Sequence, residues 1–412
     1  MTKINYRIID KCRVCNSEIN DVVIDLKDQA LTGVFVKDGT KVPKCDMTLG
    51  ICSNNSCQLV QILQAYDLSL LYGDNYGYES SLNQSMIDHL RSKAQFLDNY
   101  LELSNEDIVL DIGSNDATTL GFFPHAKKRI GVDIIGTNFL DKYQETDSIL
   151  VPDFFPSSKL KEELNGEKVR LVSSYSCFYD LPDPVSFTRS IADILHEDGI
   201  WCLEQSYMPT MIDKLAFDTI CHEHIEYYKL IDIKNICNQA NLEIVDVSLN
   251  DVNGGSFSVI VAHPKRFERN SNQIEKILNY ERSLNWKKVY LEFNEKIENN
   301  KSLTIDLLKR LKREGKRVFG LGASTKGNVL LQHYSINNDL LEGIFEVNSN
   351  KFGQQTPGTA INILDESKIS DYDIDYLFVL PWHFKSFFVN HEKFKQYKLI
   401  FPLTELTIIG DK

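Results

Sequence analysis

The sequence predicts a mixed α/β protein in which a small cysteine-rich N-terminal module precedes two separate α/β domains. Three observations support this fold class. The chain of 412 residues exceeds the length of one ordinary domain, and four of its nine cysteines lie in two close pairs near the N-terminus. Two later stretches alternate short apolar runs with helical patterns, as parallel sheets covered by helices do. We therefore expect three domains, at residues 1–75, 76–268 and 269–412.

Composition and charge exclude several classes of partner. With 42% hydrophobic and 25% charged residues, the chain has the composition of a globular protein. Acidic residues exceed basic ones, 58 to 45, and a net charge of -13 disfavours nucleic acid and anionic membranes as partners. The N-terminal residues lack the apolar core of a signal peptide, and no segment has the length and apolarity of a membrane span. We expect a cytoplasmic protein, whose oligomeric state the sequence does not set.

The N-terminal module is predicted to be a structural zinc site. Cys12 and Cys15 are separated by two residues, and Cys52 and Cys57 by four. Four thiolates on two turns can complete a tetrahedral shell around zinc, which substitutes for a hydrophobic core in a module of this size. Cys45 is a rival ligand, and free buried cysteines are the alternative to a metal site. A complete cysteine shell leaves no open position for catalysis.

The central domain is predicted from an amphipathic helix followed by a series of buried strands. Apolar residues from Met86 to Leu101 recur at helical spacing, so we expect a helix over about 85–103. Apolar runs of strand length then alternate with helical stretches, which indicates parallel strands joined by crossover helices. The predicted strands are 108–110, 129–132, 169–173, 201–204 and 256–262.

A glycine-containing loop, residues 111–117, follows the first of these strands and is expected to lead into a helix. It lacks the second and third glycines of the dinucleotide fingerprint, which a pyrophosphate needs for close backbone approach. Asp133 ends the next strand, where its carboxylate can accept hydrogen bonds from ribose hydroxyls. This combination favours S-adenosylmethionine as the cofactor, and a tight turn without a ligand is the alternative. The expected cofactor-binding residues are Asp111, Gly113, Ser114, Asn115 and Asp133.

Segment 217–228 concentrates proton-transfer groups, with two histidines, two glutamates and two tyrosines in twelve residues. General acid–base chemistry near neutral pH needs such groups. A solvated helix carrying mixed histidine and glutamate is the alternative. A metal pair made by His222 and His224 is disfavoured, because a spacing of two places the rings on different faces of a helix.

The C-terminal domain is predicted to follow a helical connection. Residues 270–315 are charged and helical in period, so we expect one long or two shorter helices there. A second glycine loop, residues 320–327, follows a strand and opens a helix, where amides and the side chains of Ser324, Thr325 and Lys326 can face an anion. Glu346, at the end of a later strand, is a candidate contact to a ribose or base. The alternative is a degenerate domain whose glycines only allow tight packing.

Several of these motifs together resemble the sugar C-methyltransferases that act on nucleotide-linked 4-keto-6-deoxyhexoses. The resemblance spans nearly the whole chain. The segments that carry it are the two cysteine pairs, residues 76–83 (Tyr-Gly-Tyr-Glu-Ser-Ser-Leu-Asn), the loop after Asp111, Glu223-His224, residues 253–256 (Asn-Gly-Gly-Ser) and residues 322–328 (Gly-Ala-Ser-Thr-Lys-Gly-Asn).

The resemblance implies a zinc-bound N-terminal module, a central class I methyltransferase domain and a C-terminal Rossmann-like domain, with the keto-sugar between them. By motif position, His224 resembles the proton-abstracting base and Glu223 its neighbour, while Tyr76 and Tyr78 resemble tyrosines that line the site. The chain departs from the family pattern at two places. Cys221 stands where the pattern has a tyrosine, and residues 178–179 (Phe-Tyr) occupy a region where it has a histidine.

The chemistry implied is methylation at carbon 3 of the sugar, which the neighbouring 4-keto group acidifies. His224 would remove the proton, with Glu223 or Glu226 orienting its ring, and the tyrosines or His222 would donate a hydrogen bond to the enolate oxygen. An NAD-dependent sugar-nucleotide oxidoreductase and a non-enzymatic binding protein are the alternatives. The residues expected to bind the sugar nucleotide are Ser324, Thr325, Lys326, Asn328 and Glu346.

Overall fold

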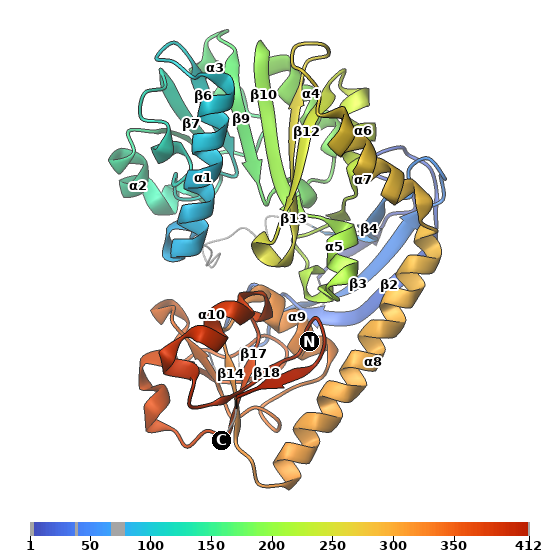
Figure 1. The fold of residues 1–412 in the computed structure, drawn as a ribbon, viewed down its shortest axis with the longest axis vertical. Coiled ribbons are helices and arrows are strands. Elements are labelled where there is room, and N and C mark those ends of the chain that lie inside the picture. The colour runs from blue at the N-terminus through green and yellow to red at the C-terminus, as the bar shows by residue number, and fades with distance from the viewer. Residues whose placement is uncertain (1–3, 38–39, 67–78, 411–412) are drawn as a thin grey trace.

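The computed structural model describes residues 4–37, 40–66 and 79–410, and it divides into three parts (Figure 1). The N-terminal part contains an antiparallel sheet, the central part a seven-stranded sheet and the C-terminal part a six-stranded sheet. Helix α8, Trp286–Arg313, leads from the central part to the C-terminal part and packs on strand β2 of the N-terminal part. The predicted α/β class, with a cysteine-rich module and two Rossmann-like domains, is confirmed.

The N-terminal sheet has the strand order β11-β4-β3-β2. Its edge strand β11, Glu226–Tyr227, comes from the segment that is rich in proton-transfer groups and pairs with β4. The N-terminal module and this distant segment therefore fold as one sheet, which the sequence did not predict. The remaining strands of this part are β1 Tyr6–Ile8, β2 Ile19–Ala30, β3 Lys44–Cys52, β4 Val60–Ile62 and β5 Gln64–Tyr66, with β1 paired to β5.

The central sheet has the strand order β12-β13-β10-β9-β6-β7-β8. β13 runs in the direction opposite to the other strands of this sheet. A short loop, residues 251–255, joins it to β12, whereas two parallel neighbours would need a long crossover connection. The sequence predicted five of these strands and missed β8 and β12. The bounds are β6 Ile108–Ile112, β7 Lys128–Val132, β8 Ile149–Val151, β9 Val169–Tyr175, β10 Leu195–Ser206, β12 Glu243–Asn250 and β13 Ser256–Ala262.

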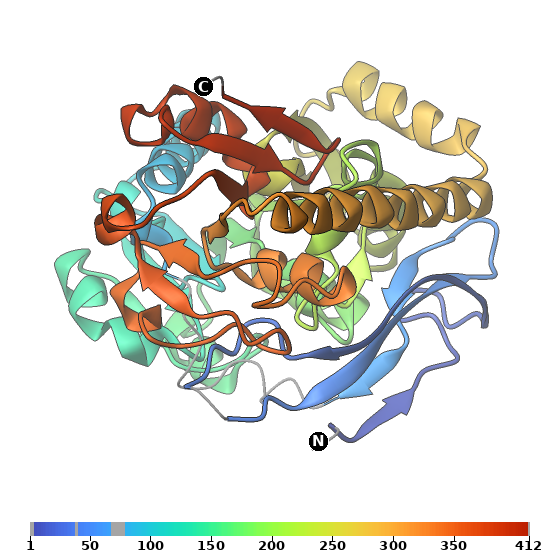
Figure 2. The ribbon, with the colours of Figure 1, turned by 90° about the horizontal axis from the view of Figure 1, so that it is seen from below.

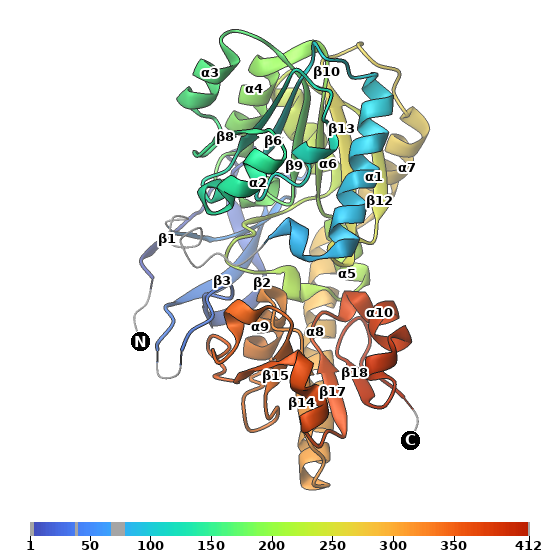
Figure 3. The ribbon, with the colours of Figure 1, turned by 90° about the vertical axis from the view of Figure 1, so that its left-hand side faces the viewer.

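Helices cover both faces of the central sheet (Figure 3). Apolar residues of α1, such as Leu97, pack on one face against Val109 and Leu171. Residues of α4 and α6, such as Ile191, pack on the other face against Leu110 and its neighbours. The helices are α1 Gln84–Leu101, α2 Leu140–Glu145, α3 Ser158–Leu164, α4 Pro184–Ile194, α5 Met208–Asp213 and α6 Leu230–Gln239.

The helix expected after the first glycine loop does not form. Only a 3-10 turn, η3 Leu120–Phe122, lies between the loop and β7. Asn115 and Ala117 have φ values of 50° and 60°, which an α-helix cannot accommodate. Asp116 Oδ1 also accepts hydrogen bonds from the backbone and hydroxyl of Thr118, at 3.2 and 2.6 Å, and such local bonds compete with helix formation.

The C-terminal part begins with two helices, α7 Ser271–Ser283 and α8, which is one of the two arrangements expected over 270–315. Its sheet has the order β16-β15-β14-β17-β18-β19, in which only β19 is antiparallel to its neighbour. The other elements are β14 Val318–Leu321, α9 Thr325–His333, β15 Ile344–Glu346, β16 Ile363–Asp365, β17 Tyr376–Val379, α10 Lys385–Asn390, β18 Lys398–Phe401 and β19 Thr407–Ile409.

One hydrophobic cluster extends through all three parts. It includes Ile24 of β2, Phe217 of the central segment, Tyr290 of α8 and Phe345 of β15. Figure 2 shows α8 lying across the C-terminal part toward the N-terminal strands, where Lys287 pairs with Asp21 at 2.8 Å. Because this core is shared, side chains from different parts of the chain can build one site.

Candidate active site

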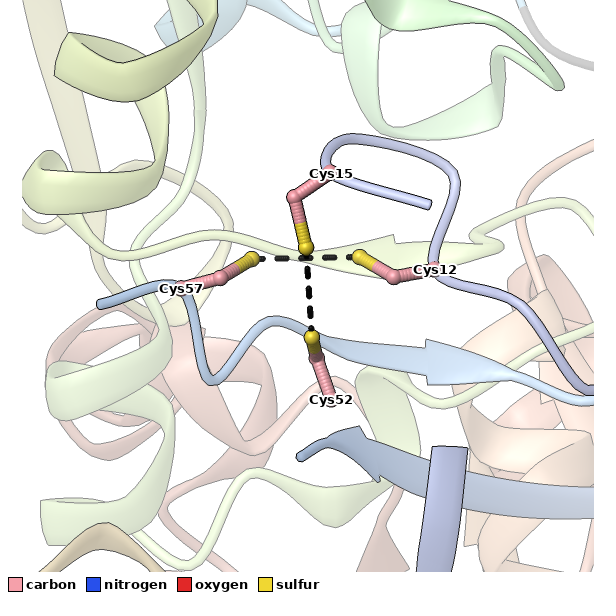
Figure 4. A group of neighbouring side chains, drawn as sticks. All are labelled: Cys12, Cys15, Cys52 and Cys57. Carbon is pink, nitrogen blue, oxygen red and sulfur yellow. Dashed lines mark hydrogen bonds between the residues drawn. The ribbon is translucent and has the colours of Figure 1, made fainter. Parts of the chain in front are cut away.

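The four predicted zinc ligands meet in the N-terminal part (Figure 4). Cys12 and Cys15 lie on the turn after β1, Cys52 ends β3, and Cys57 lies on the turn before β4. All four sulfur atoms lie within 4.8 Å of one another, with Sγ–Sγ distances of 3.8 Å for Cys12–Cys57 and 3.4 Å for Cys15–Cys52. A tetrahedral zinc site, with Zn–S bonds near 2.3 Å, separates its sulfurs by about 3.8 Å. The geometry therefore fits a zinc ion.

The pKa values of these four thiols are also consistent with a bound cation. Hydrogen bonds from Cys52 and Cys57 lower the pKa of Cys12, whereas the Cys12 thiolate raises the pKa of Cys52 to about 12 and also raises that of Cys57. Without a cation the cluster thus favours one thiolate, and a divalent ion would allow all four to ionise. Cys45, the rival ligand, lies outside the cluster and contacts the Asp46 carbonyl at 3.4 Å.

The first glycine loop lies at the carboxyl end of β6. Gly113 has a φ of 73°, and a Cβ there would lie 3.1 Å from the Cβ of Cys177. Asp111 is buried and accepts a hydrogen bond from Ser173 Oγ at 2.6 Å, and burial raises its pKa to about 7. Asp133 accepts backbone N–H bonds from Asn115 at 2.7 Å and from Ile135 at 2.8 Å. The backbone of Gly136 also bonds to this carboxylate, so about one of its roughly four acceptor positions remains for a ribose hydroxyl.

The other two predicted cofactor residues, Ser114 and Asn115, form hydrogen bonds with neighbouring parts of the protein. Ser114 Oγ shares a hydrogen bond with Tyr143 at 2.7 Å, and Asn115 Oδ1 accepts from the backbone of Ser80 at 2.9 Å. Asp116 accepts from the backbone of Ser81 at 2.8 Å, so the turn before α1 is held on the loop. Asp111, Gly113 and Asp133 stay the predicted contacts to S-adenosylmethionine, whose ammonium and ribose hydroxyls are hydrogen-bond donors. The predicted site residues Tyr76 and Tyr78 lie outside the described residues.

His224 is held in one orientation. Its Nδ1 lies 2.8 Å from the carbonyl oxygen of Thr219, and because a carbonyl only accepts, Nδ1 carries the proton and Nε2 the lone pair. The ring lies 4.0 Å, between centroids, from the ring of Tyr179. Burial lowers the pKa of His224 to about 3, and the Lys326 ammonium acts in the same direction. The imidazole is therefore neutral at physiological pH.

A cavity of about 10 Å³, room for about one water molecule, lies beside His224. Ser206, the last residue of β10, lines it together with Met208 and Tyr227. Ligands of open α/β sheets bind outside the carboxyl ends of the strands, so His224 lies at the edge of the sheet where the cofactor loop also lies.

The other predicted proton-transfer residues face different neighbours. His222 is fully buried, its carbonyl accepts a hydrogen bond from the Tyr66 hydroxyl, and its ring lies 6.0 Å from that of Tyr66. Glu223 lies against Gly33, where an added Cβ would be 2.9 Å from Oε1. Glu226 forms an ion pair with Arg13 at 3.5 Å. The expected orientation of the His224 ring by a glutamate is wrong, because the Thr219 carbonyl occupies Nδ1.

Segment 220–225 is also not a helix, so the helical-face argument about the two histidines does not apply. His222 nevertheless packs on the N-terminal part and His224 on Tyr179 of the central part. The two rings thus have separate surroundings.

The polar groups of the second glycine loop form hydrogen bonds with other groups of the protein. Ser324 Oγ caps α9 by accepting from the backbone of Gly327 at 3.0 Å. Glu346 accepts backbone N–H bonds from Ala323 at 2.7 Å and from Val347 at 2.8 Å, so its carboxylate closes the loop. A ribose would share this carboxylate with the loop, and the role of Glu346 as a contact to a ribose or base stays a prediction.

Two further predicted substrate residues connect this loop to the rest of the chain. Lys326 Nζ donates to the carbonyl of Asn253 at 2.6 Å, and Asn328 Nδ2 donates to the carbonyl of Thr32 at 2.7 Å. Thr325 Oγ1 would lie 3.8 Å from a Cβ on Gly33, next to Glu223. The start of α9 therefore meets both the central part and the N-terminal part.

Sequence reasoning missed the groups that position His224. Thr219 acts through its carbonyl, which every residue type possesses, so no residue pattern could have revealed it. Asp218 accepts a hydrogen bond from Trp382 Nε1 at 2.8 Å across 164 residues of sequence, a pairing that only the fold shows.

None of the helices in the described parts of the chain has both the length and the apolarity needed to cross a membrane.

Comparison with known proteins finds two family profiles that match parts of the chain. Residues 251–403 match the profile of the C-methyltransferase C-terminal domain, and residues 12–72 match the profile described as "Putative zinc binding domain". The chain is 27% identical over 393 residues to the C-methyltransferase NovU of Streptomyces niveus, which covers 94% of this chain and 93% of that protein.

Two methyltransferases are among the solved structures that match part of the chain. The N-methyltransferase NodS of Bradyrhizobium japonicum, in complex with S-adenosylhomocysteine, is 13% identical and covers 47% of this chain and 95% of its own, with a TM-score of 0.36. Magnesium protoporphyrin IX methyltransferase of Synechocystis is 14% identical and covers 47% of this chain and 91% of its own, with a TM-score of 0.34.

The two profiles and the NovU relative confirm the resemblance to S-adenosylmethionine-dependent C-methyltransferases. Together with the four-cysteine cluster, they also confirm the predicted cofactors, S-adenosylmethionine and structural zinc.

Proposed function

We propose that this protein methylates carbon 3 of a nucleotide-linked 4-keto-6-deoxy sugar, in branched deoxysugar biosynthesis, through an enolate that His224 generates. The observation that carries the proposal is the fixed orientation of His224. Its Nδ1 is bound to the Thr219 carbonyl, and its ring borders a cavity at the carboxyl end of β10. A neutral imidazole can accept a proton at Nε2, and because burial lowers its pKa to about 3, bound substrate must raise that pKa toward neutral for His224 to act as the base.

The reaction needs a base because carbon is a poor nucleophile until the adjacent carbonyl acidifies its C–H bond. His224 Nε2 would accept the proton from carbon 3, and the Thr219 carbonyl would stabilise the resulting imidazolium through Nδ1–H. When bound, S-adenosylmethionine supplies the electrophilic methyl group. Asp133 would hold its ribose and Asp111 would lie near its methionine part, as their places at the ends of β7 and β6 suggest.

Negative charge would develop on the 4-keto oxygen, where a hydrogen-bond donor lowers the barrier. Tyr76 and Tyr78 are the proposed donors, and His222 is disfavoured because it is fully buried against the N-terminal part. Lys326 and Thr325 are the proposed contacts to the substrate diphosphate, since Lys326 has three N–H donors and uses one of them on Asn253. We also propose the domain bounds 1–75, 76–268 and 269–412, with the sugar nucleotide between the second and third domains.

Replacement of the base tests this function. His224→Gln should lower turnover by about 10²- to 10⁴-fold, the usual contribution of general base catalysis. Binding of S-adenosylhomocysteine should stay within twofold, because His224 lies outside the cofactor loop. Activity is measured as transfer of labelled methyl to carbon in a panel of nucleotide-linked 4-keto-6-deoxysugars, with mass spectrometry of the product.

His125→Gln is the matched control, since His125 is exposed and pairs with Asp98 at 3.0 Å on the surface. Unchanged turnover of His224→Gln would remove His224 as the base. If the wild-type protein binds the cofactor but methylates no keto-sugar, the substrate class is wrong. A non-enzymatic binding protein would tolerate the replacement of His224 and give no product.

A further inference from the structure

The segment that carries the catalytic base is attached to the C-terminal part by a tryptophan. Trp382 lies in the 3-10 turn η10, Trp382–Phe384, which follows β17. Its indole Nε1 donates to Asp218 Oδ2 at 2.8 Å, and the two residues are 5% and 1% exposed. A buried carboxylate hydrogen bond of this kind is strong and costly to leave unmade.

Asp218 belongs to the turn that orients His224. It is the middle residue of the 3-10 turn η6, Phe217–Thr219, which closes through the backbone bond from Ile220 to Phe217 at 2.9 Å. The next residue, Thr219, presents its carbonyl to His224 Nδ1 at 2.8 Å. Two hydrogen bonds and one tight turn thus connect the indole of the C-terminal part to the imidazole of the base.

The indole itself is fixed from the central part. Gly254 has a φ of 93°, and a Cβ at this position would lie 3.3 Å from Trp382 Cη2. The neighbouring carbonyl of Asn253 accepts from Lys326 at 2.6 Å, which holds the same loop on α9. Trp382 is therefore held between the loop that contains Gly254 and the turn that contains Asp218.

We propose that Trp382 is a positioning residue for the catalytic base: its indole N–H holds Asp218, so that η6 presents the Thr219 carbonyl to His224 and keeps Nε2 unprotonated. The inference rests on the proposed function and adds a role for the C-terminal part in the chemical step. Docking of the C-terminal part then sets the orientation of the base, in addition to contacting the substrate nucleotide.

Trp382→Phe removes the N–H donor and keeps most of the aromatic packing. We expect turnover and the rate of solvent deuterium exchange at the acceptor carbon to fall about 10- to 100-fold, the cost of a misplaced catalytic group. The KM for the acceptor and the Kd for S-adenosylhomocysteine should stay within twofold. Ring-nitrogen NMR of labelled histidine, with His224→Gln for assignment, should show that His224 loses its Nδ1-protonated form.

Trp286→Phe is the matched control, because its buried indole donates to a backbone carbonyl, that of Glu281, at 2.9 Å, away from the base. It should keep turnover within twofold. Asp218→Asn keeps an acceptor for the indole and should lose less than threefold, whereas Asp218→Ala should match Trp382→Phe. The double variant Trp382→Phe/Asp218→Ala should be no slower than either single variant, because both break one interaction.

Unchanged turnover of Trp382→Phe, or an equal loss in Trp286→Phe, would overturn the positioning role. Additive losses in the double variant would overturn it as well. If Trp382→Phe does not fold, the contrast between Asp218→Asn and Asp218→Ala decides the same question. If the wild-type protein does not exchange the proton at the acceptor carbon with solvent deuterium, the proposed function fails. The NMR signal of His224 in the variants then still tests the positioning role of Trp382.

Discussion

The two glycine loops of this protein share a local backbone pattern but differ in the contacts of their polar groups. Each follows the first strand of a parallel sheet and turns at a glycine in the left-handed region, Gly113 with φ 73° and Gly322 with φ 81°. Each is joined by an acidic residue at or just past the end of the neighbouring strand, Asp133 or Glu346, which binds a backbone N–H of the loop. On local pattern alone, both are nucleotide sites.

The difference lies in what each loop does with its polar groups. The first loop continues without an α-helix, and Asn115 and Asp116 hold the turn before α1 on it. The second loop opens the capped helix α9, and Glu346 takes three backbone N–H groups, from Ala323, Val347 and Asn348. We therefore infer that the first loop suits a cofactor, whereas the second joins the three parts of the chain through Lys326 and Asn328. A shared motif does not imply a shared function, since the neighbours decide which groups remain available.

The largest expected difference between the loops is the loss of stability caused by a methyl group added to the second loop. Gly322→Ala places a Cβ 2.7 Å from two ring carbons of Pro381 and forces an alanine to φ 81°. We expect the free energy of unfolding to fall by about 3 kcal/mol, the sum of overpacking and left-handed strain. Chemical denaturation measures this loss, and calorimetry should show binding of S-adenosylhomocysteine unchanged within threefold.

Gly113→Ala is the matched variant in the first loop. Its Cβ would meet Cys177 Cβ and Sγ at 3.1 and 3.2 Å, contacts that a small shift can relieve. We expect a smaller loss of stability and a weakening of S-adenosylhomocysteine binding by about tenfold, because the cofactor approaches the backbone here. If Gly322→Ala instead weakened cofactor binding more than Gly113→Ala, the assignment of the two loops would be reversed.

A second contrast comes from pH, because the first loop contains a buried carboxyl. Burial raises the pKa of Asp111 to about 7, well above its usual value of 3.8. The folded protein thus retains a proton that the unfolded chain loses, so this group lowers stability as the pH rises from about 4 to 7. A cationic cofactor favours the ionised form, so affinity for S-adenosylmethionine should increase by up to about tenfold per pH unit below 7 and level off above it.

Calorimetric titrations between pH 5.5 and 8.5 measure this dependence, and Asp111→Asn should flatten it while weakening binding at pH 8. Glu346→Gln in the second loop should leave the pH profile of cofactor binding unchanged. A flat wild-type profile would show that Asp111 does not face the cationic part of the cofactor.

The sequence predicts those features that depend on local composition. Apolar runs located most strands of the central sheet, and the cysteine spacing located all four sulfurs of the cluster, because each signal comes from residues close together in the chain. The helix after the first loop was wrongly predicted, since the pattern did not reveal the left-handed Asn115 and Ala117 or the Asx turn at Asp116.

Contacts between distant segments could not be predicted in the same way. Pairing of β11 with β4 joins residues 226–227 to the N-terminal sheet, and nothing in either segment encodes its partner. The orientation of His224 by a backbone carbonyl has no side-chain signature, so the pattern suggested a glutamate instead. The roles of His224 and of the residues of the second loop in catalysis and binding stay predictions that the experiments above address.

The smallest expected effect concerns Asn328, which the sequence suggested as a substrate contact. In the structure its Nδ2 donates to the Thr32 carbonyl at 2.7 Å and so attaches the N-terminal part to α9. Asn328→Ala should cost about 1–2 kcal/mol of stability and raise the KM for the sugar nucleotide only about threefold, through loosening of the segment beside Glu223 and Thr325.

Asn300→Ala is the matched control, because Asn300 is also buried and donates to a backbone carbonyl, that of Pro402, at 3.0 Å. It should destabilise at least as much, because Asn300 also accepts hydrogen bonds from Tyr334 and Thr304, and it should leave this KM unchanged. A rise of a hundredfold or more in KM for Asn328→Ala, at unchanged stability, would make Asn328 a direct substrate contact and the second loop a binding site like the first.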